Sequence, residues 1–446
     1  MCFGIFFFGL WDLLFCGFFS FGLWNLDFGI SFYQYMRIAV IHHTIALEND
    51  YGFYVSDLLS EFATWLGYEV ELVDDFIFKN KKSLPENAVI GIDVKATGSF
   101  GLRWWYSAKL PSILAKAGAE VVINLNGMLG TAVKLPQVLA IPDVSFLQDP
   151  TKAVAAWQKL ALKNITAYTN SSSALISYSN YATGVIEKLT GSPKNAAQVV
   201  PYSGVKEYKI WEWHEKVMVK ANFADNKEFF VAILDDNRVD LWLTALKAFS
   251  KFKKWQQSNM QLLLIPKNEH AATEVLDKIS TYKYKDDVQV LDGLSLKEKV
   301  SLVACAYALL HLPSNDADVQ PIAEALQCAT PVVTIESDTI KEYLTGKGII
   351  VASVEHEALG DALIAMYKNE EQRNQMIENA KAKAAVFHRG DIAKPLWELI
   401  EGLVPKKPKM DATQIATNEA PILNADAEQS PSAGAEELSK GFPPEG

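Results

Sequence analysis

Two carboxylates eight positions apart, Asp316 and Glu324, stand on either side of a proline that is suited to begin a helix. Proline is tolerated at the first helical position, so Pro321 predicts a helix start just before Glu324. The unpaired backbone N–H groups of such a start attract a diphosphate group. Glu324 could then accept two ribose hydroxyls, while Asp316 in the preceding loop could reach a sugar. An alternative stays open, in which Glu324 only stabilises its helix through the dipole.

The composition argues against several other kinds of chemistry. The chain has 446 residues, enough for two or three domains, and a net charge of -11. An acidic chain is a poor candidate for non-specific nucleic-acid binding, which needs clustered Lys and Arg. No His and Cys residues have zinc-ligand spacing, so we expect no metal site. Cys305 and Cys328 lie in apolar surroundings, which indicates buried free thiols in a reducing compartment.

Residues 1–35 have an unusual composition, dominated by Phe, Gly, Leu, Trp and Cys, with no Lys or Arg. A signal peptide would carry a basic region at its start. A membrane-spanning helix would need about 20 uninterrupted apolar residues, and Asp12 breaks the run. We therefore expect the folded protein to begin at Met36, with the upstream stretch arising from a mis-assigned start codon. A hydrophobic membrane anchor is the alternative.

Strands and helices alternate through two successive stretches of the chain, which is typical of parallel sheets covered by helices. Apolar periodicity predicts strands at 36–43, 69–73, 88–92, 121–124, 137–141, 228–234, 261–265, 288–291, 306–311, 331–334 and 348–351. It predicts helices at 55–66, 112–117, 240–257, 271–280, 359–385 and 392–402. From Pro405 onward the composition cannot bury a core, which predicts a disordered tail.

The stretch from Arg238 to Ala352 resembles the second domain of the retaining glycosyltransferases of the GT-B fold, family 4. That family shows a proline–serine, an acidic residue, a glycine-rich loop and a second glutamate that opens a helix. Here Pro313-Ser314 precedes Asp316, and Glu324 keeps the eight-residue offset. Weaker similarities, such as the turn around Gly52, extend the resemblance from Met36 to about Leu403.

The resemblance implies an α/β fold with two Rossmann-like domains that face a central cleft. It implies an acceptor domain at 36–205, a nucleotide-sugar donor domain at 206–386, a closing helix at 387–403 that returns to the first domain, and a tail at 404–446. In this arrangement Arg238 stabilises the departing diphosphate and Asp316 orients the sugar. The implied donor-binding residues are Glu324, Val319, Gln320 and Pro321, and the acceptor-side candidates are Gly52, His42 and Asp143.

Several positions expected to contact the substrate depart from the family pattern. The family's Arg-Lys pair keeps Arg238, but the Lys position is Val239. The glycines of the phosphate loop are replaced by Ala317 and Val319, and Asp318 adds a negative charge that we expect to oppose anion binding. In the first domain, a family His-Asp pair becomes Pro142-Asp143, and an early double glycine becomes Asn49-Asp50.

Three functions stay open. The first is a retaining glycosyltransferase of polysaccharide biosynthesis that moves a hexose from a nucleotide-diphosphate sugar to a saccharide or lipid-linked acceptor. It would need no cofactor or metal and would work in the cytoplasm, with peripheral contact at the inner face of the membrane as an open alternative. The second is a catalytically impaired paralogue that serves as a binding or scaffolding partner. A nucleotide-dependent enzyme of another class is disfavoured, because no Gly-x-Gly-x-x-Gly or P-loop motif is present.

Two aromatic or titratable runs have a structural and a functional interpretation. His42 and His43 end the first predicted strand, where a cleft would lie, yet either could simply pack at the strand end. Trp104-Trp105-Tyr106 could stack on an acceptor sugar, although such runs are more often part of a core.

Overall fold

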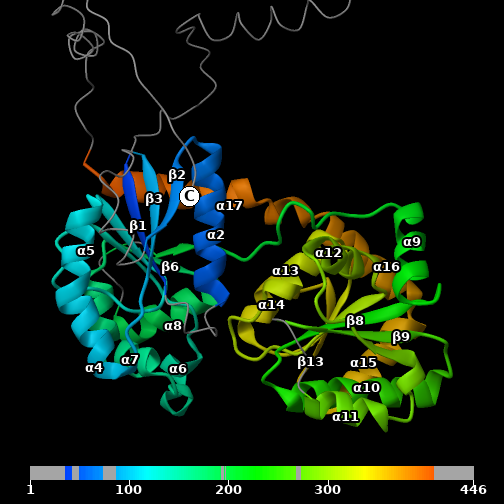
Figure 1. Ribbon diagram of the computed structural model, residues 1–446. Coiled ribbons are helices and arrows are strands. Elements are labelled where there is room, and N and C mark those ends of the chain that lie inside the picture. Colours follow the sequence, from blue (N-terminus) through cyan, green and yellow to red (C-terminus); the bar gives the residue numbers. More distant parts are fainter. Residues whose placement is uncertain are drawn as a thin grey trace, which may run out of the picture. The chain divides into compact units, whose positions relative to one another are not determined.

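The structure is a computed structural model that describes residues 36–42, 50–73, 87–191, 195, 197–267 and 273–405 (Figure 1). The expectations for residues 1–35, His43, Asn49 and the tail from residue 406 lie outside these described residues. No helix in the described ranges has both the length and the apolar character that a bilayer crossing requires.

The first domain is built on a seven-stranded sheet in the order β2-β3-β1-β4-β5-β6-β7, in which all neighbours are parallel. Its strands are β1 (Arg37–His42), β2 (Glu69–Val73), β3 (Ala88–Asp93), β4 (Val121–Asn124), β5 (Gln137–Ala140), β6 (Ala174–Ser177) and β7 (Ala197–Val199). Its helices are α2 (Asp50–Trp65), α4 (Gly98–Trp104), α5 (Leu110–Ala117), α6 (Ser145–Gln148), α7 (Ala156–Ser171) and α8 (Asn180–Thr190), with a π-helical turn at Trp105–Lys109 and a 3-10 turn at Pro150–Lys152.

The second domain is built on a six-stranded parallel sheet in the order β10-β9-β8-β11-β12-β13. Its strands are β8 (Phe229–Leu234), β9 (Gln261–Pro266), β10 (Val288–Val290), β11 (Ala308–His311), β12 (Val332–Ile335) and β13 (Gly348–Val351). Its helices are α9 (Trp213–Phe223), α10 (Val239–Gln256), α11 (Thr273–Ser280), α12 (Leu296–Cys305), α13 (Gln320–Gln327), α14 (Asp338–Leu344), α15 (His356–Lys368) and α16 (Glu370–Lys381). The predicted α/β fold with two parallel sheets is confirmed.

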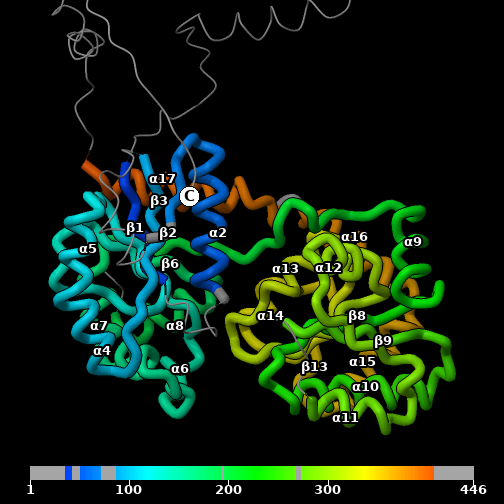
Figure 2. The backbone as a smooth tube through the Cα atoms, viewed as in Figure 1, coloured from blue at the N-terminus to red at the C-terminus, as the bar shows by residue number. Residues whose placement is uncertain are grey.

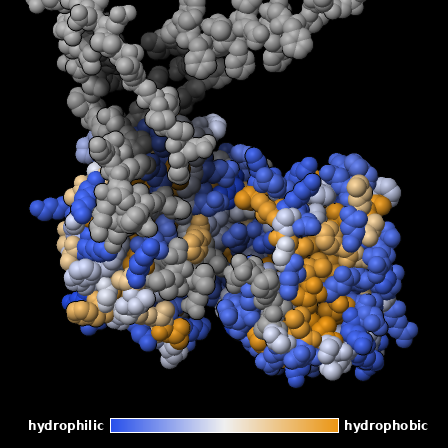
Figure 3. Space-filling view, in the orientation of Figure 1, coloured by the Kyte–Doolittle hydropathy of each residue, from blue (hydrophilic) through white to orange (hydrophobic). Residues whose placement is uncertain are grey.

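The strands form because they are apolar runs that helices cover on both faces of a sheet. All six residues of β8 are buried, and α10 packs Trp242 and Phe249 into the same core. On the face drawn in Figure 3, hydrophilic residues cover the rim of the second domain and hydrophobic residues gather toward its middle. Helices α10 and α15 approach closely at Gly360, where a Cβ atom would lie 2.8 Å from the side chain of Lys251.

The single helix predicted at 359–385 is wrong, because the chain forms two helices there. Asn369 leaves the helical conformation and caps α16, since its side chain accepts a hydrogen bond from the backbone N–H of Gln372. The last helix, α17 (Arg389–Leu403), lies beside α2 of the first domain, and Figure 2 traces the chain into it. Arg389 donates to Asp57 and Glu61 of α2, each at 2.6 Å.

A cluster of buried tyrosines surrounds the segment that connects the two domains. Tyr51 and Tyr54 donate to the backbone carbonyls of Val200 and Pro201, at 3.1 and 2.8 Å. Tyr343 of α14 accepts from the backbone N–H of Tyr202 and donates to the carbonyl of Tyr178, both at 2.9 Å. These bonds fix the loops that follow β6 and β12, which contribute to the site described next.

Candidate functional site

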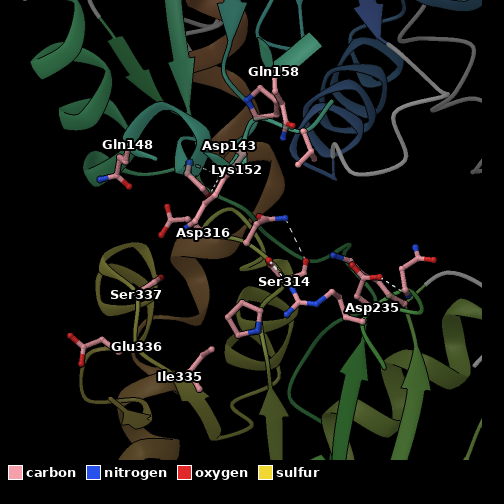
Figure 4. A pocket seen from close by; sticks show the side chains of 18 of the residues that line it. Asp143, Gln148, Lys152, Gln158, Asp235, Ser314, Asp316, Ile335, Glu336 and Ser337 are labelled. Carbon is pink, nitrogen blue, oxygen red and sulfur yellow. Dashed lines mark hydrogen bonds between the residues drawn. The ribbon is translucent and has the colours of Figure 1, made fainter. Parts of the chain in front are cut away.

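A pocket of about 680 Å³ lies at the carboxyl ends of strands from both sheets (Figure 4). The first domain contributes the residues after β5, including Pro142 and Asp143, together with Lys152 of the 3-10 turn. The second domain contributes the last residue of β12 and residues that follow β8, β9, β11 and β12. These are Asp235, Asn237, Arg238, Lys267, Pro313, Ser314, Asn315, Asp316, Ile335, Glu336 and Ser337. Carboxyl ends of parallel strands are where ligands bind in open α/β sheets, so this pocket is the candidate site.

Asp143 is a half-buried carboxylate on the first-domain side of the pocket. Its Oδ1 accepts from the backbone N–H and the hydroxyl of Ser145, at 2.9 and 2.5 Å. Burial raises the pKa of Asp143, and the nearby charge of Asp316 adds to this, although the Ser145 hydrogen bonds oppose it. A carboxyl with a raised pKa can exchange protons closer to neutral pH than an ordinary aspartate.

Asp316 lies across the pocket from Asp143 and is held by two hydroxyl groups. Its Oδ2 accepts from Tyr178 at 3.0 Å and from Thr339 at 2.7 Å. Tyr178 in turn accepts from the backbone N–H of Val144 at 3.2 Å. Burial raises the pKa of Tyr178 well above its usual range, and both aspartates reinforce the shift, so the tyrosine stays a neutral donor to Asp316.

Arg238 lies at the start of α10 and lines the pocket. Its guanidinium already donates hydrogen bonds within the protein. Its Nε and Nη2 donate to the carboxylate of Asp240 at 2.9 and 2.8 Å, and Nη1 donates to the carbonyl of Ser314 at 3.4 Å. The hydrogen bonds to Asp240 raise its pKa. The side chain is 41% exposed, so the guanidinium can still meet an anion in the pocket.

Lys267 is a pocket residue that the sequence analysis missed. It follows β9, and its Nζ lies 3.0 Å from Oδ1 of Asp318. No motif marks a lysine at this place, and its ion pair with Asp318 connects it to the loop after β11. It supplies a cation to the pocket although the family's Lys position is Val239.

Asp318 does not face the pocket, so the expectation that its charge opposes anion binding there is wrong. Its carboxylate is 95% covered beneath the loop and also accepts from the backbone N–H and hydroxyl of Ser314, at 2.9 and 3.1 Å. Burial acts to raise the pKa of Asp318, but Lys267, His311 and Ser314 outweigh it and lower the pKa to about 2. The carboxylate is therefore charged and neutralised by Lys267.

Glu324 lies in α13 but does not line the pocket. Only 3% of the residue is exposed, and its Oε1 accepts from Gln320 at 3.0 Å. Its Oε2 has no hydrogen-bond partner within the described residues, and the nearest cation, Lys299, lies at 3.8 Å. Gly204 packs directly against it, since a Cβ there would lie 3.1 Å from Cγ of Glu324. A buried carboxylate oxygen without a donor is costly, and it is the kind of atom that a bound hydroxyl would satisfy.

The remaining predicted site residues are not brought to the pocket. Helix α13 begins at Gln320 with Pro321 next to it, as the sequence predicted, and Val319 is its buried N-cap residue. His42 ends β1, where it is buried; burial lowers its pKa, and Asp93 opposes this. Gly52 lies in the first turn of α2.

The aromatic run of the first domain is divided between core and surface. Trp105 and Tyr106 are buried, and the Tyr106 hydroxyl donates to Asn126 at 2.7 Å. Trp104 is 54% exposed. Both Cys305 and Cys328 are buried free thiols, as predicted. No group of His, Cys, Asp and Glu in the described ranges is arranged to hold a metal ion.

Fold and pocket together define a GT-B protein, in which two Rossmann-like domains supply one site. Residues 215–383 match a family described as glycosyl transferases group 1. The match covers most of the second domain, which is therefore similar to a glycosyl transferases group 1 domain. No curated protein matches the chain.

Three solved structures share the fold. The Anabaena HepE complex with UDP and glucose has a TM-score of 0.60 and 14% identity, covering 82% of this chain and 99% of that one. Sucrose-phosphate synthase from Thermosynechococcus elongatus has a TM-score of 0.63 and 15% identity, with coverages of 82% and 99%. WaaG, a glycosyltransferase involved in lipopolysaccharide biosynthesis, has a TM-score of 0.62 and 15% identity, with coverages of 82% and 100%. At these identities the likeness concerns the fold alone.

Proposed function

We propose that the protein transfers a sugar, with retention of configuration, from a nucleoside-diphosphate sugar to a saccharide or lipid-linked acceptor in glycan biosynthesis. The observation that carries this proposal is the pocket at the carboxyl ends of both sheets, which combines the cations Arg238, Lys267 and Lys152 with the carboxylates Asp143 and Asp316. The family match and the UDP and glucose of the Anabaena complex support the donor class.

In this proposal the protein lowers the barrier by positioning the reactants and by stabilising charge on the leaving diphosphate. Arg238 and Lys267 meet the diphosphate from the second domain. Asp316, aligned by Tyr178 and Thr339, accepts a hydroxyl of the donor sugar. Asp143 lies on the acceptor side, where its raised pKa suits exchange of a proton with an acceptor hydroxyl.

We propose that the ribose of the nucleotide donates hydrogen bonds to the carboxylate of Glu324. The Oε2 of this carboxylate has Lys299 at 3.8 Å and Tyr208 close to the carboxylate, and a ribose hydroxyl would add a direct hydrogen-bond donor. Because Glu324 is covered at present, this step requires the residues around it, including Gly204, to shift when the nucleotide binds.

The proposed lipid-linked acceptor would approach through an exposed aromatic pair on α4. Phe100 is 85% exposed, Trp104 is 54% exposed, and the exposed Arg103 lies between them. Positions four apart lie on one helical face, so the pair can enter the interfacial layer of a bilayer while Arg103 meets anionic headgroups. This arrangement supports action at the inner face of a membrane.

A second candidate is an impaired paralogue that acts as a binding partner. It is favoured by the fact that Arg238 and Lys267 already pair with Asp240 and Asp318. In that case the pocket would bind a nucleoside diphosphate weakly or not at all.

Calorimetry with UDP on the full chain tests the proposal. We expect binding by the wild type, and Arg238→Met should weaken it about tenfold through loss of a charge-assisted contact. Lys254→Met is the matched control, since it removes the same charge from an exposed position on α10 and should leave binding unchanged. Absence of binding for UDP, GDP and ADP at millimolar concentration would favour the paralogue. Proton NMR of the product made from a UDP-sugar then reports whether the anomeric configuration is retained.

A further inference from the structure

A second pocket, of about 320 Å³, lies at the amino ends of β11 and β12, at the edge of the second sheet opposite the first pocket. Its walls come from residues 210–212, α9, the turn at 328–331 and α16. Both strands are four residues long, so about 13 Å of sheet lies between the two pockets. The second pocket is therefore a separate space that the proposed transfer reaction does not use.

Basic side chains dominate the charged lining of this second pocket. Lys216 comes from α9, Arg373 and Lys381 come from α16, and Glu212 is the one acidic residue among them. Lys381 is paired with Glu378 at 2.8 Å. Lys216 makes no ion pair within the described part of the chain, which is notable in a protein with a net charge of -11.

Arg373 also lacks a counter-charge among the described residues. Its guanidinium carbon lies 4.0 Å from the ring centroid of Tyr307, and its Nε donates to the Tyr307 carbonyl at 3.5 Å. These contacts fix the plane of the guanidinium and leave its two terminal nitrogens for another partner. A planar guanidinium held in this way is suited to bind an oxyanion.

The two neighbouring thiols do not add negative charge to that of Glu212. Burial raises the pKa of Cys305 to about 11 and raises that of Cys328 further, so both thiols are neutral near pH 7. Burial lowers the pKa of Lys216; the two cysteines oppose this shift, and the like charges of Lys220 and Arg373 add to it. Like charges gathered beside a cavity would be relieved by a bound anion.

An indole in the same pocket has an unused donor. Trp211 lines the pocket, and its buried Nε1–H has no acceptor within the described residues. A buried donor without a partner is rare and indicates a missing acceptor. Trp211, Lys216 and Arg373 all line this one pocket, so a small anion bound there has all three donors around it.

We propose that this pocket is a binding site for a small phosphate-bearing molecule. The phosphate oxygens accept from Lys216, Arg373 and Trp211, and the rest of the ligand lies along the apolar wall formed by Ile210, Ile377 and Pro331. The site is independent of the proposed nucleotide-sugar pocket, so it stands whether or not UDP binds there.

NMR of the Trp211 indole gives a local test on the full chain labelled with nitrogen-15. The resonance is assigned by its loss in Trp211→Phe and is followed during titration with inorganic phosphate or glycerol 3-phosphate at constant ionic strength, with chloride as control. We expect a saturable shift with phosphate and glycerol 3-phosphate. Lys216→Met should raise the dissociation constant about tenfold, because a charge-assisted hydrogen bond is lost.

Lys220→Met is the matched control. Lys220 lies one turn further along α9, carries the same charge and pairs with Glu228 outside the pocket. Its removal should change the constant by less than about twofold. Arg373→Gln provides a second arm and should also weaken binding. A shift that never saturates, or equal constants for wild type and both pocket variants, would overturn the proposal.

Discussion

Replacing Lys267 by methionine should destabilise the second domain at neutral pH. The change leaves the carboxylate of Asp318 charged and covered, with only the donors of Ser314. Removing one partner of a buried ion pair costs on the order of 3 kcal/mol. In a domain of this size that corresponds to a fall in the melting temperature of roughly 6–12 °C.

The pH dependence of the free energy of unfolding tests this ion pair more specifically than the loss of stability at neutral pH. In the wild type the pKa of Asp318 falls from 3.8 to about 2, which corresponds to about 2 kcal/mol of stability. Because the folded-state pKa is lowered, this contribution is present above about pH 3.8 and is lost as the pH falls toward about 2. In Lys267→Met, burial is opposed only by His311 and Ser314, so we expect the pKa of Asp318 to rise above that of the wild type. Acidification should then cost the variant less stability than it costs the wild type.

Thermal and denaturant unfolding of the full chain from about pH 2 to about pH 8 would measure both effects, because the range includes the folded-state pKa of Asp318 of about 2 as well as its ordinary value of 3.8. The double variant Lys267→Met/Asp318→Asn is the control, since it leaves no buried charge, and it should recover most of the stability without a pH slope at this site. If Lys267→Met matches the wild type in stability and in pH slope, the ion pair contributes nothing and the reasoning is refuted.

The same variants test whether Lys267 meets the ligand. Asp318→Asn and the double variant differ only at residue 267, and neither contains an unpaired buried carboxylate. If Lys267 contacts a diphosphate, Asp318→Asn should bind UDP about tenfold more tightly than the double variant. Equal affinities would remove Lys267 from the donor site, while failure of every protein to bind would count against the proposed function itself.

Further predictions concern other parts of the molecule. Glu324→Gln should weaken UDP binding about tenfold by calorimetry, because the amide loses one charged acceptor; unchanged binding would exclude a ribose contact. Arg389→Met should destabilise the chain by about 1 kcal/mol in denaturant unfolding, since its partners Asp57 and Glu61 are more than half exposed. Phe100→Ser/Trp104→Ser should lose sedimentation with vesicles rich in anionic lipid, while Trp65→Ser, an exposed tryptophan on α2, should not. Transfer from a UDP-sugar should persist in EDTA; restoration by manganese of activity lost to the chelator would contradict this.

The sheets could be predicted from the sequence because buried parallel strands are continuous apolar runs. The run at 228–234 is wholly apolar after its first residue, and it forms β8. The strands β6 and β7 were not predicted, because β6 ends at the polar Ser177 and β7 contains Gln198, so neither is a continuous apolar run. The break at Asn369 was missed because helical periodicity continues on both sides of it, and only the capping bond of its side chain separates α15 from α16.

The site was predicted in part, for reasons that follow from where its residues lie in the chain. Arg238 and Asp316 follow strand ends, and the topology brings strand ends together, so their meeting with Asp143 in one pocket follows from the order of strands. Glu324 has the expected place in its helix, yet its burial depends on packing by Gly204, which is far away in sequence. Such contacts carry no local signal.

The loop after β11 shows most clearly why position-by-position comparison misleads. Taken alone, Asp318 adds a negative charge where an anion should approach, and Val239 removes a positive one. In the folded chain Asp318 turns beneath the loop and holds Lys267 at 3.0 Å, so a cation reaches the pocket from a different strand end. The loss of a lysine at Val239 and the gain of Asp318 can then be understood together, because Asp318 holds Lys267 as the cation of the pocket. A site judged weakened from its motif can keep its balance of charges through residues that the motif does not contain, and the two Asp318 variants separate these outcomes.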